Sequence, residues 1–440
     1  MTMLRLHETL RRRVCRASFC LLCVLPTAGL LGFSASRTHP SHTRRCESEL
    51  SDLLGLRAKL AVVRYPRPGV TLYEGLELAD PETGECALRC PWLEFESVDG
   101  RVLLSATRPE IETARLKLLW ELLMRRLRRE LATDGEVRLS PCQVTLRASR
   151  GSQTYDVTQA LVEHVDQGEA IEIRFRPTGA DDSEPAAFRV VRERSQAVPF
   201  TRLEIMTYAS ELPVSIFAPL ADVEAWLGGD SRFAGSFWID ELADGWKADM
   251  TGQLRGVDLQ SLIGDRFPHQ LNGPADIEID RALFDRGRLT EADGSFSAGP
   301  GTIGTSLLDA AVESLELEPG QFNRTRKTAL AFEELAFRFH VDAGGLVIAG
   351  ACRGAPSRGV VLVGSNDRVL LASPREGSLP PVIGIIRMLV PQSEVRVPAT
   401  RETAGLLQVL PVPPIVPRND GARERPPEGR LRLAPSREAP

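Results

Sequence analysis

The segment Ile171-Glu172-Ile173-Arg174-Phe175-Arg176 decides the fold class, because apolar and charged residues alternate along it without interruption. Successive side chains of a β-strand point to opposite faces of a sheet, so this period of two predicts a strand with one apolar and one charged face. The same alternation returns at Ile277 and Ile279 and at Phe337 and Phe339. We therefore expect a mainly β protein.

Turn dipeptides separate these runs of alternating residues. Asp99-Gly100, Asp244-Gly245, Asn272-Gly273 and Asp293-Gly294 are typical of tight hairpin turns. Short connections imply antiparallel pairing, and a sheet with one apolar face and one solvated face is typical of antiparallel architecture. The pattern predicts a long curved antiparallel sheet with a few helices.

The clearest predicted helix spans residues 111–131. Leu116, Trp120, Leu123 and Leu127 recur on it with a spacing of three to four residues, which places them on one face. The helix also carries four arginines, Arg125, Arg126, Arg128 and Arg129. Two interpretations stay open: the helix caps the sheet with its arginines in solvent, or these arginines hold it against an anionic membrane surface.

An apolar segment near the N-terminus, Ala17 to Ala35, follows a basic stretch at residues 1–16. About 19 residues at about 1.5 Å each nearly cross a hydrocarbon core of about 30 Å. We expect a single transmembrane anchor with the basic N-terminus in the cytoplasm. A cleaved signal peptide is the alternative, because Phe33-Ser34-Ala35-Ser36 offers small residues for cleavage.

Composition excludes some classes of function. The net charge of -5 argues against a nucleic-acid partner, because phosphate binding requires a basic excess. Of the eight cysteines, three lie in or beside the apolar segment, so the chain has no disulfide framework. From about Pro411 the sequence becomes rich in proline and charge, which predicts a disordered tail at residues 411–440.

Catalytic motifs are scarce in this chain. Gly299 to Gly304 matches the dinucleotide fingerprint G-x-G-x-x-G, but that motif binds pyrophosphate only in a parallel βαβ unit, and the flanking patterns indicate antiparallel strands. We interpret it as a glycine turn at a strand-to-helix corner. His269 and His340 have no histidine partner at helical spacing. We expect no metal site, no cofactor and no enzymatic activity.

The order of these parts resembles the AsmA-like family of bacterial envelope proteins, which includes the TamB-type proteins with a repeating β-groove. The N-terminal resemblance follows the anchor, and a second resemblance lies in the C-terminal half. The segments that carry it are Leu53-Leu54-Gly55, Ala58 to Val63, Pro66 to Gly69, Gly75 to Gly84, Gly252 to Leu259, Leu271-Asn272-Gly273 and Gly294 to Gly301.

The resemblance implies a single-pass protein of the inner membrane whose body lies in the periplasm. It implies an N-terminal β domain at residues 36–230, a C-terminal β domain at residues 231–410, and a groove that binds or transfers membrane lipid during outer-membrane assembly. The expected groove residues are Ile171, Ile173, Phe175, Ile277, Ile279, Phe337 and Phe339. The alternative is a non-enzymatic envelope scaffold whose apolar faces form a closed core and which binds an envelope protein partner.

Overall fold

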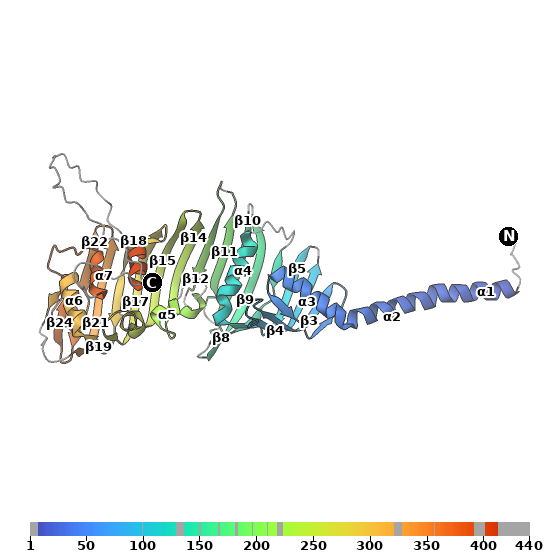
Figure 1. The fold of residues 1–440 in the computed structure, drawn as a ribbon, viewed down its shortest axis with the longest axis horizontal. Helices are drawn as coiled ribbons and strands as arrows, with labels where there is room; N and C mark the ends of the chain where they lie inside the picture. The colour runs from blue at the N-terminus through green and yellow to red at the C-terminus, as the bar shows by residue number, and fades with distance from the viewer. Residues whose placement is uncertain are drawn as a thin grey trace, which may run out of the picture.

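The computed structural model describes residues 8–98, 100–128, 136–148, 151–165, 168–180, 184–195, 197–208, 210–217, 223–320, 328–355, 357–390 and 401–411. Within these residues, 24 strands belong to one sheet. The sheet forms an elongated body, and one long helix projects from its N-terminal end (Figure 1). The prediction of a mainly β chain with a large antiparallel sheet is confirmed.

The projecting helix comprises α1 (Glu8–Phe19), a π-helical turn η1 (Cys20–Val24) and α2 (Leu25–Thr38). Its stretch from Arg12 to Arg37 has the length and apolar composition to cross a membrane, and it contains the whole predicted segment, Ala17 to Ala35. Leu22 and Leu30 are each 70% exposed. This helix is therefore a candidate single-pass anchor.

Helix α3 (Pro40–Leu54) joins the anchor to the body. It begins where the backbone N–H of Ser41 donates to Nδ1 of His39 at 3.2 Å. It ends at Gly55, which adopts the left-handed conformation and donates its N–H to Ser51 O at 2.8 Å. These two caps set the ends of α3. The segment Leu53-Leu54-Gly55, which the sequence singled out, is the C-terminal end of this helix.

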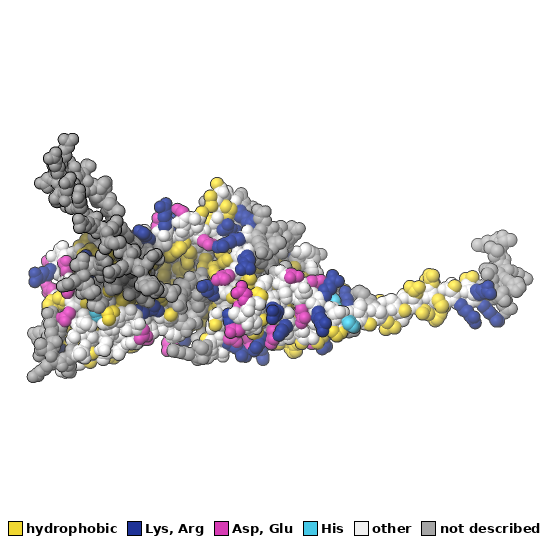
Figure 2. Space-filling view, viewed as in Figure 1, with side chains coloured by type: hydrophobic (Ala, Val, Ile, Leu, Met, Phe, Trp, Pro, Cys, Tyr) yellow, Lys and Arg dark blue, Asp and Glu magenta, His cyan; other side chains and the backbone are white. Residues whose placement is uncertain are grey.

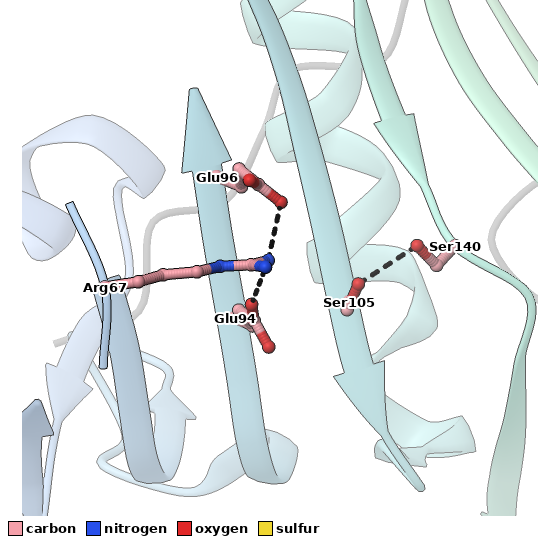
Figure 3. A network of polar contacts seen from close by, with 5 residues as sticks. All are labelled: Arg67, Glu94, Glu96, Ser105 and Ser140. Atoms are coloured by element: carbon pink, nitrogen blue, oxygen red, sulfur yellow. Dashed lines mark hydrogen bonds and ion pairs between the residues drawn. The ribbon is translucent and has the colours of Figure 1, made fainter. Parts of the chain in front are cut away.

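The sheet begins with β1 (Arg57–Lys59) and β2 (Val62–Arg64), which both pair with β3 (Val70–Ala79), followed by β4 (Cys86–Val98), β5 (Arg101–Thr107) and β6 (Glu110–Glu112). The Arg67 guanidinium lies between Glu94 and Glu96 on β4, at 3.2 and 3.0 Å (Figure 3). The hydroxyls of Ser105 and Ser140 meet at 3.0 Å.

Helix α4 (Leu116–Arg128) makes the crossover in this part of the sheet, with η2 (Thr113–Arg115) before it and β7 (Val137–Leu139) and β8 (Cys142–Ala148) after it. Strands β5 and β7, and β6 and β8, pair in parallel, so the expectation of purely antiparallel pairing is wrong here. The prediction that this helix starts at residue 111 is also wrong, because Ile111 takes a ladder position opposite Leu88 on β4.

The long strands among the rest follow one another across the sheet in chain order, the short ones depart from it, and all of their pairing is antiparallel. Their bounds are β9 (Gly151–Val165), β10 (Gly168–Pro177), β11 (Ala186–Glu193), β12 (Phe200–Met206), β13 (Leu212–Pro213), β14 (Arg232–Leu242), β15 (Gly245–Asp258), β16 (Leu271–Asn272), β17 (Pro274–Asp285), β18 (Arg288–Ala298), β19 (Gly301–Gly304), β20 (Glu318–Pro319), β21 (Ala329–Asp342), β22 (Gly345–Gly350), β23 (Val360–Gly364) and β24 (Arg368–Ala372). Strand β14 pairs with both β12 and β13, so the sheet continues across the expected boundary at residue 230.

Short helices lie with α4 on the same face of the sheet (Figure 1). They are η3 (Val214–Phe217), α5 (Val223–Leu227), η4 (Gln260–Gly264), α6 (Thr305–Ser314), α7 (Ile383–Leu389) and α8 (Arg401–Val409). Residues 412–440, which belong to the predicted disordered tail, lie outside the described part of the chain. Most of these helices bury apolar side chains in the largest hydrophobic cluster, whereas α7 and α8 also pack in a smaller cluster with Phe267, so the core lies between the helices and the sheet.

The sheet topology shows where two glycine motifs of the sequence lie. Gly301 to Gly304 forms β19, which pairs antiparallel with β16 and β21 and leads directly into α6, so the strand-to-helix passage agrees with the prediction. The predicted glycine turn is wrong for these four residues, because they form a strand. Asp293-Gly294, by contrast, lies inside β18, and its prediction as a turn is wrong. A Cβ added at Gly294 would lie 2.1 Å from the carbonyl oxygen of Glu278 on β17 and 2.9 Å from the Phe339 ring, which explains a glycine within a strand.

Candidate functional site

All seven apolar residues singled out from the sequence belong to one face of the sheet. Ile171, Ile173 and Phe175 lie on β10, Ile277 and Ile279 on β17, and Phe337 and Phe339 on β21. Ile171 is buried in the largest hydrophobic cluster, and the other six are partly exposed and pack against that cluster. The strands thus bring together residues that are up to 168 positions apart, from Ile171 to Phe339.

Strand register aligns this face into continuous apolar rows. The longest row passes through Ile173, and beyond Ala160 it continues to Leu139, Leu104 and Phe95 on β7, β5 and β4. Its section from β9 to β22 has one directly paired residue on each of ten strands: β9, β10, β11, β12, β14, β15, β17, β18, β21 and β22. The members of this section are Ala160, Ile173, Phe188, Ile205, Phe237, Met250, Ala282, Ala292, Val341 and Leu346. Strands spaced about 4.8 Å apart give this section a length of about 43 Å.

A second row runs beside it through Ile171, from Val162 on β9 to Leu289 on β18. A third contains Ile277 and Phe337, and its paired members are Leu212, Phe233, Leu254, Ile277, Phe296 and Phe337. The apolar face is therefore several side chains wide as well as many strands long.

Helices pack against both ends of this face, and in its middle Phe217 of η3 contacts Phe237 edge-on, with ring centroids 5.5 Å apart. Trp120 of α4 contacts Phe188 edge-on, with ring centroids 5.9 Å apart, and α6 and α7 bury Leu308 and Ile386 at the other end. Between them, Phe237 and Met250 remain partly exposed. Figure 2 shows hydrophobic side chains gathered at the surface over β14 and β15.

An apolar cavity of about 190 Å³ continues the third row beneath α6 and α7. Its lining contains only hydrophobic residues, among them Phe296, Phe337, Leu307 and Met388. Apolar cavities of about 150 Å³ stay dry and bind small apolar molecules. The cavity therefore suits the end of a hydrocarbon chain better than it suits water.

The opposite face of the same strands is charged. Arg174 pairs with Glu172 at 2.6 Å, and Arg202 forms two hydrogen bonds of 2.7 Å with the carboxylate of Asp240. The neighbourhood of Asp240 raises the pKa of the Arg202 guanidinium, because the charged form is held by these bonds. Such a face stays hydrated, so the sheet has two surfaces of opposite character.

The structure describes the side chains of two of the four arginines of the predicted basic helix. Arg125 and Arg128 are exposed on α4, and Arg128 pairs with Glu241 of β14. The side chain of Arg126 and all of Arg129 lie outside the described residues. Leu127 and Met124 of this helix are buried in the cluster, which agrees with a helix that caps the sheet; a membrane role for the arginines stays a prediction.

His340 is paired across strands. Its Nδ1 lies 2.6 Å from a carboxylate oxygen of Asp293, and Asp293 and Glu291 stand on β18 opposite β21. One ligand atom from each of the three residues lies within 4.8 Å of the others, so they could hold a metal ion. The sequence missed this group because its members meet through strand register and have no helical spacing. The bond to Asp293 raises the pKa of His340.

His269 has the opposite environment, beneath α6. It is 5% exposed, and its Nδ1 lies 3.1 Å from the Ser306 hydroxyl. Burial lowers the pKa of this imidazole, so the neutral form is favoured. The buried His269 thus packs against α6 through Ser306.

Sequence reasoning also missed apolar residues that the structure adds to this face, chiefly Phe237, Met250 and Phe296. The alternation Phe233-x-Gly235-x-Phe237-x-Ile239 was the signal for β14, but a glycine interrupts its apolar series. Gly235 pairs directly with Gly252 on β15, and both adopt positive φ angles, of 155° and 146°. The strands approach so closely here that a side chain does not fit.

No protein-family model matches this chain, and neither a curated protein nor a solved structure matches it.

Proposed function

We propose that this chain is a non-enzymatic, membrane-anchored envelope protein of the AsmA-like type, whose apolar sheet face forms a groove that binds the hydrocarbon chains of membrane lipid. The observation that carries the proposal is the ten-strand section of the apolar row through Ile173, which stays partly exposed at Phe237 and Met250. Apolar side chains that stay partly exposed together on a hydrated protein are typical of a binding site.

The dimensions and chemistry of the face suit a lipid. Its length of about 43 Å exceeds that of a single acyl chain and compares with the thickness of a whole bilayer. The cavity beside Phe337 offers a dry end for such a chain. The candidate anchor would hold the groove at the inner membrane with its body in the periplasm, where transfer toward the outer membrane begins.

The test is extraction of the full-length protein into mild detergent, followed by mass spectrometry of the bound lipids. We expect phospholipid in the wild type and a clear loss in Met250→Asp, which puts a charge on the apolar row. Thr251→Asp is the matched control, because the next residue of β15 is exposed and its hydroxyl faces Ser236. Equal lipid content in the two variants, or no lipid in the wild type, would reject the proposal.

The alternative is an envelope scaffold with a closed core, and the coverage of both ends of the face by α4, α6 and α7 favours it. It predicts no bound lipid in the same extraction and a protein partner in chemical crosslinking of intact cells. Lipid that is lost specifically in Met250→Asp would exclude this alternative.

A further inference from the structure

A second pocket, separate from the apolar face, lies where the candidate anchor joins the body. It has a volume of about 810 Å³ and lies between the corner formed by α2 and α3 and strand β2. Its lining includes Arg37, Arg44, Arg64, Tyr65, Thr43 and Glu47. The volume is within the range of pockets that bind small molecules.

Positive charge dominates this pocket. Three arginines line it, against the single carboxylate of Glu47, which accepts a hydrogen bond from the Leu60 N–H at 2.9 Å. Arg44 is exposed, and Arg64 pairs with Glu74 at 3.0 Å. Basic and histidine side chains gather where the helix meets the body (Figure 2).

An aromatic residue fixes the geometry of the pocket. The Arg37 guanidinium lies 4.0 Å from the centre of the Tyr65 ring, and the Tyr65 hydroxyl lies 2.6 Å from Nε2 of His42. Stacking of this kind orients the plane of a guanidinium. Arginine in such an arrangement recognises phosphate through two parallel hydrogen bonds.

The location of the pocket relates it to a membrane surface. The apolar stretch of the candidate anchor ends at Arg37, which is itself a lining residue. Val62, 39% exposed, also lines the pocket and adds an apolar side. Arginine and tyrosine at the end of a membrane helix lie at the depth of the lipid headgroups.

We propose that this pocket binds the phosphate-bearing headgroup of an anionic phospholipid and so presents that lipid to the apolar face. The proposal rests on the proposed function and adds to it the class of lipid. Free phosphate carries the same chemistry as the headgroup, and the experiment separates the two sources.

The experiment uses the full-length protein in nanodiscs that contain either phosphatidylglycerol or phosphatidylcholine, with bound lipid counted by native mass spectrometry after release. We expect the wild type to retain phosphatidylglycerol about tenfold better than phosphatidylcholine, as one or two charge-assisted hydrogen bonds provide. The double variant Arg37→Gln, Arg44→Gln is expected to retain the two lipids equally.

The matched control is Arg45→Gln. Arg45 is the next residue of α3, pairs with Glu49 at 2.8 Å, and is outside the pocket lining. It should leave the preference unchanged. Circular dichroism checks that the variants are folded, and the single variant Arg44→Gln, at an exposed position, gives an intermediate preference.

The proposal is overturned by the absence of a preference for phosphatidylglycerol in the wild type, or by an equal loss of preference in Arg45→Gln. Retention of inorganic phosphate at the pocket, with no lipid preference, would assign the site to free phosphate and overturn it as well. Binding of a neutral pyrene-labelled diacylglycerol reports on the apolar face alone. If that probe binds while the headgroup preference is absent, the pocket proposal fails and the proposed function stands.

Discussion

Phe296 on β18 and Phe337 on β21 stack across the sheet, with ring centroids 5.1 Å apart and ring planes at 14°. They are directly paired in the strand register, and both line the apolar cavity beneath α6 and α7. This pair therefore links the open part of the apolar face to its enclosed end. The same two rings therefore contribute to the stability of the sheet and to the shape of the cavity.

We predict that Phe337→Ala lowers the free energy of unfolding by about 2–4 kcal/mol, since it removes a stacked ring and enlarges the cavity. Urea denaturation followed by circular dichroism measures this change. Val347→Ala on β22 is the control, because Val347 is 45% exposed and should cost less than about 0.5 kcal/mol. Equal losses in the two variants would contradict a structural role for the stack.

We predict that Gly252→Ala destabilises the sheet by about 2 kcal/mol or more. Gly252 has a φ of 146°, and an added Cβ would lie 2.4 Å from the carbonyl oxygen of Ala234 on β14. Gly299→Ala is the control, because nothing lies within 4 Å of its added Cβ. Thermal unfolding of both variants tests this; a melting temperature for Gly252→Ala equal to that of Gly299→Ala would disprove the close strand approach.

His269 should make the protein less stable in acid. Burial lowers its pKa from 6.5 in the folded state, so below about pH 6.5 the unfolded chain binds a proton that the folded chain does not. Stability contributed by this residue is therefore lost as the pH falls below about 6.5. The free energy of unfolding of His269→Gln, measured by urea titration from pH 8 to pH 5, should show a smaller decline than that of the wild type.

His340 should act in the opposite direction. Its pKa is raised above 6.5 by the hydrogen bond to Asp293, so its contribution is complete below about pH 6.5 and is lost as the pH rises through the raised value. In His340→Asn, this loss on the alkaline side should disappear. NMR titration of the imidazole provides a direct check, and a pKa at or below 6.5 in the folded protein would refute the assignment.

Much of the fold could be predicted from local pattern. Alternation in the segment beginning at Ile171 correctly places charged side chains on one face and apolar side chains on the other, because the side-chain period of a strand is two. The leucine spacing predicts α4 correctly except at its start, where Ile111 joins the ladder. The apolar N-terminal segment could also be predicted as a candidate membrane helix, because length and composition alone identify such a helix.

Other features depended on contacts between distant parts of the chain. Asp293-Gly294 has the composition of a turn, yet it lies within β18 because Gly294 is paired with Ile279 on β17 and with Phe339 on β21. The group of Glu291, Asp293 and His340 is equally invisible in sequence, since it forms only through the pairing of β18 with β21. Local composition carries no information about such register.

The amino-acid sequence by itself determined the faces: which residues are apolar, which are charged, and where one helix is long enough to cross a membrane. The tertiary structure decided how those faces align, because hydrogen-bonded register between strands, and not periodicity, sets which apolar residues become neighbours. Register placed Ile173 and Met250 in one row, and the return of β2 beside α2 and α3 created the arginine-lined pocket. Periodicity acts within a segment, whereas a groove, a cavity or a headgroup pocket requires segments to meet.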